Sequence, residues 1–368
     1  MRPLPLRDMH LAMGATMTEW ADGEWCYIYK DATEEHIACR ERVALFDWTP
    51  LGEVDIRGAR ALDFVDYLVT NRVRDLRLGQ VRYTPIAEPD GTLLDDSTVY
   101  MLRPDHIQVI HGLRPDLDWF GQVARDFGVQ LTDITERRVV ASLQGPASYR
   151  TLSRLTTVNL APMKWFHFTY ALVGDIQCRI SRTGYHGEIG YEISCAPEQG
   201  EALWGLLLES GKQEGLMPAG FGAVDPLRLE KGYLTPLVDF GPGEKRVNVL
   251  ESGLGWAVDF SKKDFVGKDA LTRARDEGLK RAIIYFDAEA DGIAEGDAIL
   301  DGERQVGVVL SGMVTPTVGR FIGFARVEPP RPVGARLSVR TGGGTVPITV
   351  ARKGLYDTSN DRLRAKPQ

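Results

Sequence analysis

The stretch that decides the fold of this chain reads Asp90-Gly91-Thr92-Leu93-Leu94-Asp95-Asp96-Ser97-Thr98-Val99-Tyr100. It begins with turn residues and continues as a strand-like alternation that carries two adjacent carboxylates. Neighbouring side chains of a strand point to opposite faces of its sheet, so Asp95 and Asp96 cannot both face one pocket. Taken alone, the stretch is typical of the mouth of a hairpin, because Asp and Gly are ordinary turn residues.

The segments around this stretch predict an antiparallel sheet. Residues 78–86 supply the other arm of a hairpin around residues 88–91, and residues 106–111 extend the sheet with a third strand. Further strands are predicted at residues 52–58 and 139–143. Helices are predicted at residues 32–45, 59–68, 119–127, 201–213 and 226–232, the last with a proline in its first turn.

A glycine-rich segment at residues 178–193 is the second landmark. Gly184, Gly187 and Gly190 stand three residues apart among aromatic and acidic side chains. Glycine permits a positive φ or a close approach of backbone to a ligand, and neighbouring aromatic rings can stack on a planar molecule. The alternative is a plain hairpin with a glycine-rich turn.

The pattern changes near residue 275. A charged helix is followed by short strands divided by Gly and Pro, which is typical of a small antiparallel barrel or sandwich. The expected strands are residues 282–286, 307–310, 321–327, 336–340 and 347–351.

The composition describes an ordinary globular protein of more than one domain. Of its 368 residues, 43% are hydrophobic and 26% are charged. The formal net charge of -7 argues against a nucleic-acid or membrane-surface partner, because either would need a basic field. The sequence contains no apolar run long enough to cross a bilayer, and its first residues lack the apolar core of a signal peptide, so a cytoplasmic protein is expected.

Metal chemistry is not expected. The four cysteines have no CxxC spacing and the six histidines are dispersed, so reduced, partly buried thiols are predicted and no metal ligands are assigned. The sequence also has neither a GxGxxG nor a P-loop motif.

Short motifs follow one another through nearly the whole chain in a recognisable order. They lie at residues 54–58, 83–84, 91–100, 143–146, 183–193, 227–232, 253–256, 263–267, 311–319 and 355–357. Together they resemble the folate-dependent aminomethyltransferase family, which includes the T-protein of the glycine cleavage system. The resemblance implies an α+β fold of three domains in a cloverleaf around a central channel that holds tetrahydrofolate, with a C-terminal antiparallel β-barrel.

The resemblance also implies a domain plan. Residues 1–274 are expected to form a folate-binding module of two interleaved subdomains, and residues 275–368 the barrel. The subdomains comprise approximately residues 1–52 with 138–222, and residues 53–137 with 223–274.

The resemblance assigns roles to several residues. Asp95 maps to the acid near the reacting folate nitrogens, where a carboxylate can orient the cofactor, stabilise positive charge or accept a proton. Asp96 is left with a structural role. The cofactor-binding candidates are Tyr83, Tyr100, Tyr185, Glu192 and Arg228. A buried glutamate suits a pterin, because its carboxylate can accept paired hydrogen bonds from the amino and ring N–H groups.

Departures from the family pattern mark the donor side of the site. T-proteins usually carry Asn where this chain has His111 and Arg where it has Val224, and the replacement by Val removes a charged donor. The candidates for the substrate pocket are therefore Trp48, His111, Val224 and Trp256, with a structural role as the alternative for His111 and the tryptophans. The segment Lys231-Gly232-Tyr233 lacks the cysteine of the family's iron-sulfur-repair branch.

These observations favour a tetrahydrofolate-dependent one-carbon transferase. The main hypothesis is a methyltransferase or demethylase that moves a methyl or related group from a small methylated substrate to tetrahydrofolate. One alternative is the glycine cleavage aminomethyltransferase, which acts on a lipoylated carrier protein, and another is a non-catalytic folate-binding protein. The sequence leaves open whether the donor is an amine, an ether or a sulfonium, and it leaves the oligomeric state open.

Overall fold

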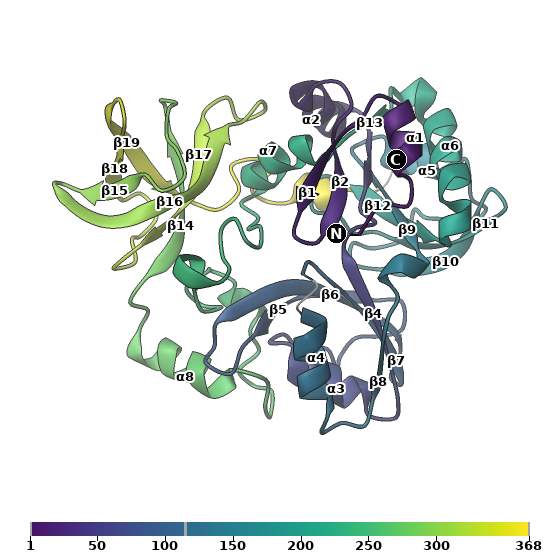
Figure 1. Cartoon of the computed structure of the whole chain (residues 1–368), viewed down its shortest axis with the longest axis horizontal. Coiled ribbons are helices and arrows are strands. Elements are labelled where there is room, and N and C mark those ends of the chain that lie inside the picture. Colours follow the sequence, from purple (N-terminus) through teal and green to yellow (C-terminus); the bar gives the residue numbers. More distant parts are fainter. Residues whose placement is uncertain (1, 114–115, 367–368) are drawn as a thin grey trace.

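The computed structural model describes residues 2–113 and 116–366, which fold into three lobes around the centre of the molecule (Figure 1). The first lobe, at the upper right of Figure 1, and the second lobe, at the bottom, are both sheets covered by helices. The third, at the upper left, is a closed barrel. This mixed α/β architecture with a C-terminal barrel confirms the predicted fold class.

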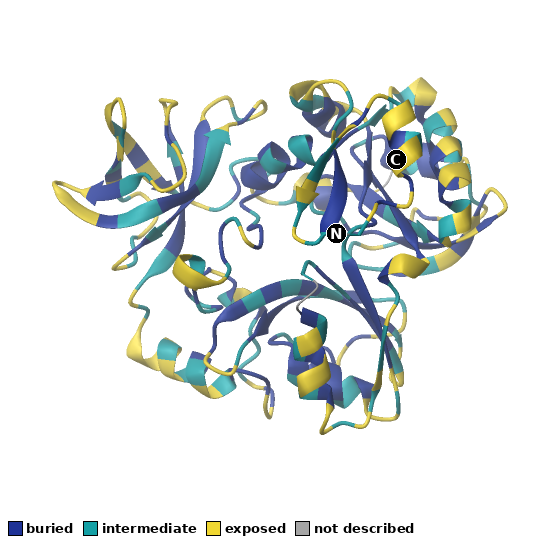
Figure 2. Ribbon diagram, in the orientation of Figure 1, coloured by how far each residue is buried: buried dark blue, intermediate teal, exposed yellow. Residues whose placement is uncertain are grey.

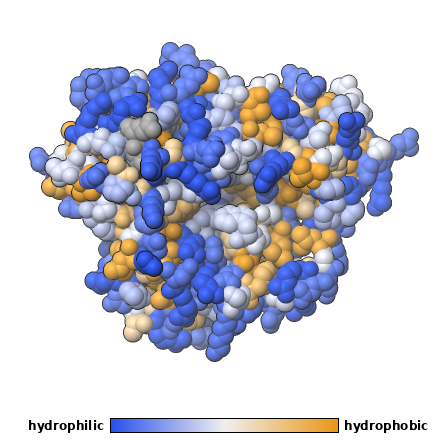
Figure 3. All heavy atoms as spheres, turned by 180° about the vertical axis from the view of Figure 1, so that it is seen from behind, coloured by the Kyte–Doolittle hydropathy of each residue, from blue (hydrophilic) through white to orange (hydrophobic). Residues whose placement is uncertain are grey.

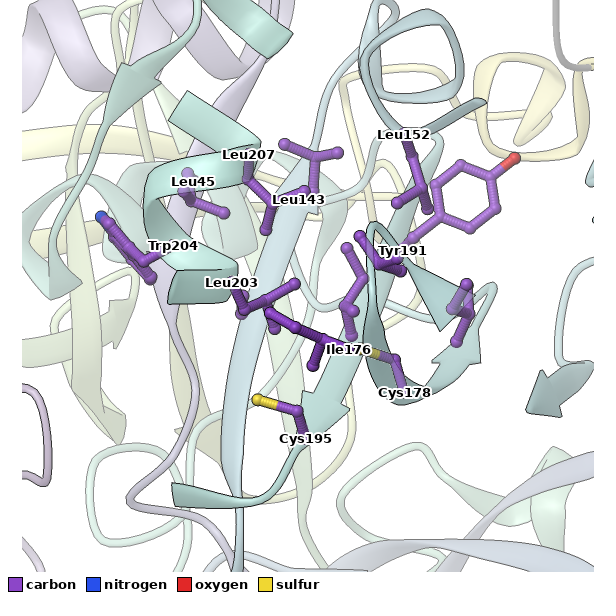
Figure 4. Packing of buried hydrophobic residues seen from close by; sticks show 14 of the residues in the cluster. Leu45, Leu143, Leu152, Ile176, Cys178, Tyr191, Cys195, Leu203, Trp204 and Leu207 are labelled. Carbon is purple, nitrogen blue, oxygen red and sulfur yellow. The ribbon is translucent and has the colours of Figure 1, made fainter. Parts of the chain in front are cut away.

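The first lobe contains a six-stranded sheet in the order β10-β11-β12-β9-β3-β13. Its strands are β3 (Ala44–Asp47), β9 (Val139–Gln144), β10 (Phe168–Val173), β11 (Ile176–Ser181), β12 (Gly190–Cys195) and β13 (Met217–Pro218). Its helices are α1 (Arg7–Ala12), α5 (Ser148–Ser153) and α6 (Gly200–Gly211). Figure 4 shows Trp204 and Leu207 of α6 packed with Leu45 and Leu143 of the sheet, and these four side chains belong to one buried cluster.

The second lobe contains a five-stranded antiparallel sheet in the order β5-β6-β7-β4-β8. Its strands are β4 (Gly52–Arg57), β5 (Val81–Ala87), β6 (Leu93–Arg103), β7 (His106–His111) and β8 (Gln130–Asp133), and its helices are α3 (Ala61–Leu68) and α4 (Asp116–Ala124). The predicted hairpin and its third strand are confirmed, because β6 pairs with β5 on one side and with β7 on the other. Phe64, Val65 and Leu68 of α3 are fully buried beneath this sheet.

The barrel closes because β14 pairs with both β17 and β19. Its strands are β14 (Ala282–Ala288), β15 (Ala298–Asp301), β16 (Arg304–Val314), β17 (Phe321–Val327), β18 (Arg336–Thr341) and β19 (Gly344–Ala351). Helix α8 (Lys268–Glu277) precedes it and α9 (Asp361–Arg364) follows it. Of the two predicted alternatives, the barrel is therefore observed.

Helices α2 (Ala32–Glu41) and α7 (Phe221–Lys231) lie between the first lobe and the barrel, beside the hairpin of β1 (Thr16–Trp20) and β2 (Gly23–Ile28) (Figure 1). Several predicted helix boundaries are wrong, and the helix expected at residues 119–127 is observed as α4, which both begins and ends earlier. The helix expected at residues 32–45 ends earlier because the chain enters β3. The last predicted helix begins at Phe221, so Pro226 lies inside it, where burial of Ala223 and Val224 keeps the preceding turn helical.

The core and the surface separate cleanly. Buried residues follow the sheets and α7, while exposed ones occupy the outer faces of the helices and the loops (Figure 2). Hydrophilic side chains predominate on the face in Figure 3, and hydrophobic ones gather there in separate patches.

No helix in the part of the chain that the structure describes is long and apolar enough to cross a membrane. All four cysteines are buried free thiols, as predicted.

We propose the division of residues 1–274 into the two interleaved subdomains on the basis of these sheets. The sheet of the first lobe takes its strands from residues 44–47 and 139–218, and the sheet of the second lobe takes them from residues 52–133. The chain therefore leaves the first lobe after β3 and returns to it at β9.

A buried ion-pair network joins α2 to α7 and to the end of the chain. Arg40 Nη2 lies 2.8 Å from Glu230 Oε2 in α7, and Arg40 Nη1 lies 3.2 Å from Glu188 Oε1. Glu230 Oε1 accepts a hydrogen bond from Thr317 N of the barrel at 3.0 Å, and Glu188 Oε2 accepts one from Arg362 Nε at 3.0 Å. One cation thus links two helices, the glycine-rich segment and, through its acidic partners, the barrel and the C-terminal helix.

Replacing Arg40 by Met is expected to destabilise the fold. The substitution leaves two buried carboxylates without their main cation, a loss that typically costs about 3–5 kcal/mol. Urea unfolding followed by circular dichroism should show a lower midpoint. Lys30→Met, which breaks an exposed pair with Glu34, should leave the midpoint in place. Equal midpoints for the two variants would contradict the structural role of Arg40.

Candidate active site

Two neighbouring chambers lie between the first and second lobes and share part of their lining. The first, of about 200 Å³, is called the aromatic chamber here, and the second, of about 620 Å³, the basic chamber. The aromatic chamber is lined by aromatic rings and by several charged or titratable groups, among them Trp20, Trp25, Trp48, Phe221, Asp96, His111, Arg138, Glu192, Asp225 and Arg228. The basic chamber is bounded by Arg82, Lys231, Lys353, Arg364, Trp256 and Asp357.

The wall common to both chambers brings together two of the predicted cofactor-binding residues. Tyr83 of β5 and Tyr185 of the glycine-rich segment line both cavities, and Asp96 of β6 lies with them. A ligand longer than either chamber would cross this wall and contact all three side chains.

The structure reverses the expected orientation of the carboxylate pair. Asp96 lines both chambers, whereas Asp95 is fully buried behind them, where its Oδ2 accepts a hydrogen bond from Gly112 N at 2.7 Å. The expectation that Asp95 faces the site is therefore wrong. The physical reason is the alternation of side chains along β6. Asp95 lies on the same face of the strand as Val99 and Met101, which pack in the core of the second lobe.

Asp96 is poised to change charge near neutral pH. Burial and then the neighbouring carboxyl group of Asp95 raise the pKa of Asp96 to about 7, and a hydrogen bond from Tyr83 opposes this rise. Tyr83 Oη donates that bond to Asp96 Oδ2 at 2.7 Å, and burial raises the pKa of Tyr83, which keeps it a neutral donor. A carboxylate with these properties can accept a proton or balance a positive charge in the chamber.

Glu192, a predicted cofactor contact, is a half-buried acid. It lies on β12 and lines the aromatic chamber, and its Oε2 accepts a hydrogen bond from Thr183 Oγ1. Burial raises the pKa of Glu192, and the hydrogen bond from Thr183 opposes this effect. Tyr100, also a predicted cofactor contact, lies outside the lining described for either chamber. Its hydroxyl is 3.4 Å from Thr183 Oγ1, so it supports Glu192 from behind.

Arg228 and Tyr185 are held rigidly at the chamber wall. Arg228 Nε donates to Asp225 Oδ1 at 2.8 Å and Nη1 donates to Asp239 Oδ2. Arg228 Nη2 is buried and has no hydrogen-bond partner among the described residues, which leaves one donor for a bound ligand. Tyr185 Oη donates to Leu234 O at 2.6 Å, so its ring is fixed while its face borders both chambers.

Three of the predicted substrate residues meet in the aromatic chamber and the fourth does not. Trp48, His111 and Val224 line that chamber. Trp256 borders the basic chamber instead, where its ring stacks on Tyr83 with centroids 5.5 Å apart and planes at 15°. It is 71% exposed, so it lies at the mouth.

Sequence reasoning missed the aromatic partners of Trp48. Trp20 and Trp25 come from the β1–β2 hairpin and Phe221 begins α7. The ring centroid of Trp25 lies 5.7 Å from the ring centroid of Trp20, 5.6 Å from that of Trp48 and 5.2 Å from that of Phe221. The Asp22-Gly23 dipeptide between the two hairpin tryptophans is a strong hairpin signal and would have placed them on one short element.

Several basic residues that the sequence did not single out line the basic chamber. Lys231 Nζ donates to Asn360 Oδ1 at 2.8 Å, and Lys353 Nζ donates to Ser252 O at 2.8 Å. Burial lowers the pKa of Lys353 to about 8. With Arg82 these cations give the chamber the positive lining that a ligand with carboxylates requires.

A second buried cluster lies directly behind Asp96. It consists of Asp95, His111 and Asp116 of α4, whose ligand-type atoms all lie within 4.8 Å of one another. Such spacing can suit a cation, but His111 Nδ1 already donates to Leu113 O at 2.9 Å. Asp116, just before the helix predicted at residues 119–127, gave no sequence signal.

The two chambers point to a class of protein. A half-buried acid and an unpartnered arginine donor lie in one chamber, cations line the other, and a carboxylate with a raised pKa stands between them. Such a combination suits an enzyme that binds a long, partly planar, anionic ligand and moves a charged or protonated group beside it.

Comparisons with known proteins identify the family. The model of the GCVT N-terminal domain matches residues 6–262, and that of the glycine cleavage T-protein C-terminal barrel domain matches residues 281–357. The chain belongs to the glycine cleavage T-protein family. It is therefore a folate-dependent transferase, and its cofactor is tetrahydrofolate.

Relatives match along almost the whole chain. The aminomethyltransferase of Halothermothrix orenii is 38% identical over 335 residues, which cover 89% of this chain and 92% of the relative. The aminomethyltransferase of Alkaliphilus oremlandii is 34% identical over 364 residues, which cover 97% of this chain and 98% of the relative. The solved glycine cleavage system aminomethyltransferase T from Bartonella henselae superposes with a TM-score of 0.89 over 97% of this chain and 98% of its own, at 23% identity, and so shares the fold.

Replacing Tyr83 by Phe is expected to raise the pKa of Asp96 above about 7, because it removes the hydroxyl that stabilises the ionised carboxylate. Loss of one hydrogen bond to a charged group corresponds to a shift on the order of one pH unit. Carboxyl ¹³C NMR of aspartate-labelled protein should show it, with Asp96→Asn identifying the signal. Tyr185→Phe, whose hydroxyl donates to Leu234 O, is the matched control. An unmoved Asp96 titration in the Tyr83 variant would contradict the assignment.

Proposed function

We propose that this enzyme is a tetrahydrofolate-dependent aminomethyltransferase, with Asp96 as its catalytic carboxylate. The observation that carries the proposal is the position of Asp96 at the wall common to both chambers, within hydrogen-bond distance of Tyr83. The relatives named aminomethyltransferase, which match nearly the full length of the chain, support the choice of the transferred group.

The lining of the chambers fits tetrahydrofolate at both ends. Glu192 offers a half-buried carboxylate for the amino and ring N–H groups of a pterin, and Arg228 Nη2 is a buried donor with no partner among the described residues. Lys231 and Lys353 lie in the basic chamber, where the glutamate carboxylates would find cations. We therefore propose that the pterin occupies the aromatic chamber and the glutamate tail the basic chamber, which brings the folate nitrogens to Asp96.

Tetrahydrofolate supplies the nucleophilic nitrogen that receives the one-carbon unit, and the chain supplies the charge and the positioning. The ionised Asp96 carboxylate would attract the positive charge that develops on the transferred carbon and can take up a proton at Oδ1 or Oδ2. Tyr83 fixes the orientation of Asp96 through its hydrogen bond. Trp48 and Phe221 border the chamber with apolar surface that excludes water, which strengthens these electrostatic interactions.

For the donor, we propose an aminomethyl group delivered by a lipoylated carrier protein, with release of ammonia. A second candidate is a small methylated donor, and the aromatic end of the chamber favours it specifically. The rings of Trp20, Trp25 and Trp48 attract methylated cations through their π faces, and Val224 adds no competing positive charge. Both donors present a cationic one-carbon unit to Asp96.

Two isosteric variants decide which carboxylate is catalytic. Asp96→Asn should lower tetrahydrofolate-dependent turnover by about a hundredfold or more, because it removes the group that accepts the proton. Tetrahydrofolate should still bind, as measured by calorimetry. Asp95→Asn should retain turnover, because Asp95 does not reach the chambers. Near-normal turnover in Asp96→Asn, or loss of turnover only in Asp95→Asn, would refute the assignment.

Product analysis distinguishes the donors. With an aminomethylated lipoyl carrier and tetrahydrofolate, the wild-type protein should release ammonia and form methylene-tetrahydrofolate, and Asp96→Asn should not. Mass spectrometry of the folate products should be run in parallel with N-methylated amines and sulfonium compounds. If methyl transfer occurs from these compounds and no product forms with the lipoyl carrier, the small methylated donor replaces the aminomethyl group as the proposed donor. Tight tetrahydrofolate binding with no product from any donor would contradict both and leave a folate-binding protein.

A further inference from the structure

The cluster of Asp95, His111 and Asp116 has no use in the proposed reaction, yet it lies directly behind the catalytic carboxylate. All three side chains are almost fully buried. Asp95 Oδ1 and both carboxylate oxygens of Asp116 have no hydrogen-bond partner among the described residues. Two buried carboxylates this close together cannot both carry a charge without a compensating proton or cation between them.

The histidine does not provide that compensation. His111 Nδ1 lies 3.3 Å from Asp116 Oδ2 but donates its hydrogen to Leu113 O at 2.9 Å. Burial lowers the pKa of His111, so the ring stays neutral near pH 7. The Nε2 atom of His111 lies against Gly52, so close that a Cβ atom at position 52 would be only 2.4 Å from it. A neutral imidazole fixed in this way leaves the charge of the two carboxylates unbalanced.

A shared proton fits the geometry better than a metal ion. The ring nitrogen that lies 3.3 Å from Asp116 Oδ2 is Nδ1, and it donates to Leu113 O, which leaves Nε2, next to Gly52, as the one ring atom of His111 with a lone pair for a metal ion. A proton needs only one oxygen of each carboxylate, and Asp95 Oδ1 is available because Oδ2 is occupied by Gly112 N. Burial and the neighbouring Asp116 raise the pKa of Asp95 well above its ordinary value, whereas burial raises the pKa of Asp116 to about 6. The proton therefore resides mainly on Asp95.

We propose that Asp95 and Asp116 share one proton, and that this proton keeps Asp95 neutral so that Asp96, on the opposite face of the same strand, can ionise in the chamber. Asp95, Asp116 and His111 are then positioning residues for Asp96. The inference rests on the proposed catalytic role of Asp96. It explains why a strand carries two adjacent acids when only one reaches the ligand.

The coupling between the two carboxylates is electrostatic. An ionised Asp95 would repel the charge of Asp96 and raise its pKa, as a neighbouring like charge does. The groups that face this pair from the surrounding elements are Tyr83 of β5, His111 of β7, Asp116 of α4, Arg138, Tyr185, Glu192 of β12, and Asp225 and Arg228 of α7. Of these, Asp116 raises the pKa of Asp95 and His111 opposes the rise, so removal of Asp116 favours the ionised form of Asp95.

The pH dependence of turnover tests the proposal through a double-mutant cycle. Activity that requires ionised Asp96 has an acid limb, along which turnover falls as the pH decreases. Asp116→Asn lets Asp95 ionise, so the acid limb should move to higher pH by on the order of one unit. Asp95→Asn mimics the neutral acid, so its limb should stay at the wild-type pH or move lower. In the double variant, Asp95→Asn with Asp116→Asn, the acid limb should return to the pH observed for Asp95→Asn alone. A merely structural role of Asp116 would not give this rescue.

The controls separate this inference from the proposed function. Asp118→Asn, an exposed acid on the same helix, should leave the limb in place. Infrared difference spectra of wild type against Asp95→Asn at neutral pH should contain the C=O band of a protonated carboxyl, whether or not the protein has turnover. The shared proton would be overturned if the acid limb of Asp116→Asn stays at the wild-type pH, or if it moves and the added Asp95→Asn substitution does not move it back. A missing infrared band would also overturn it. So would the finding that the wild type holds one equivalent of chelatable metal that these variants lack.

Discussion

The chambers depend on one buried cation. Arg40 neutralises Glu188 and Glu230, and those two acids in turn contact α9 and the barrel. Burying charged groups costs free energy that pairing only just offsets, so such a network is tolerated only when every partner is in place. Because Glu230 and Arg228 lie on the same helix, the arrangement that satisfies Arg40 also fixes the wall of the aromatic chamber.

Much of the fold was predictable because it follows from local patterns. The alternation and turn residues around residues 81–103 specified the central hairpin, and the short strands after residue 281 indicated a barrel or a sandwich, although β15 was not predicted. The misplaced start of α7 had a different origin. Pro226 is a strong local signal for a helix start, but burial of Ala223 and Val224 outweighs it. Local propensity yielded there to tertiary packing.

The candidate site was predictable only in part. Tyr83, Tyr185, Glu192 and Arg228 lie in the chamber linings, but Asp95, which was expected to face the site, does not, and its neighbour Asp96 does. The alternation of β6 held the correct answer, since Asp95 has the parity of Val99 and Met101, both apolar. The aromatic chamber was harder to foresee. Its rings come from a hairpin, a strand end and a helix start that are distant in sequence, so only the folded chain brings them together.

The segment that follows the barrel has a consequence for how ligand binding and stability are connected. Lys353, Asp357 and Arg364 line the basic chamber, and Arg362 completes the ion-pair network that reaches α2. One short segment thus contributes both to a chamber wall and to the contacts between lobes. Local unfolding of this segment would therefore open the basic chamber and weaken the ion-pair network at the same time.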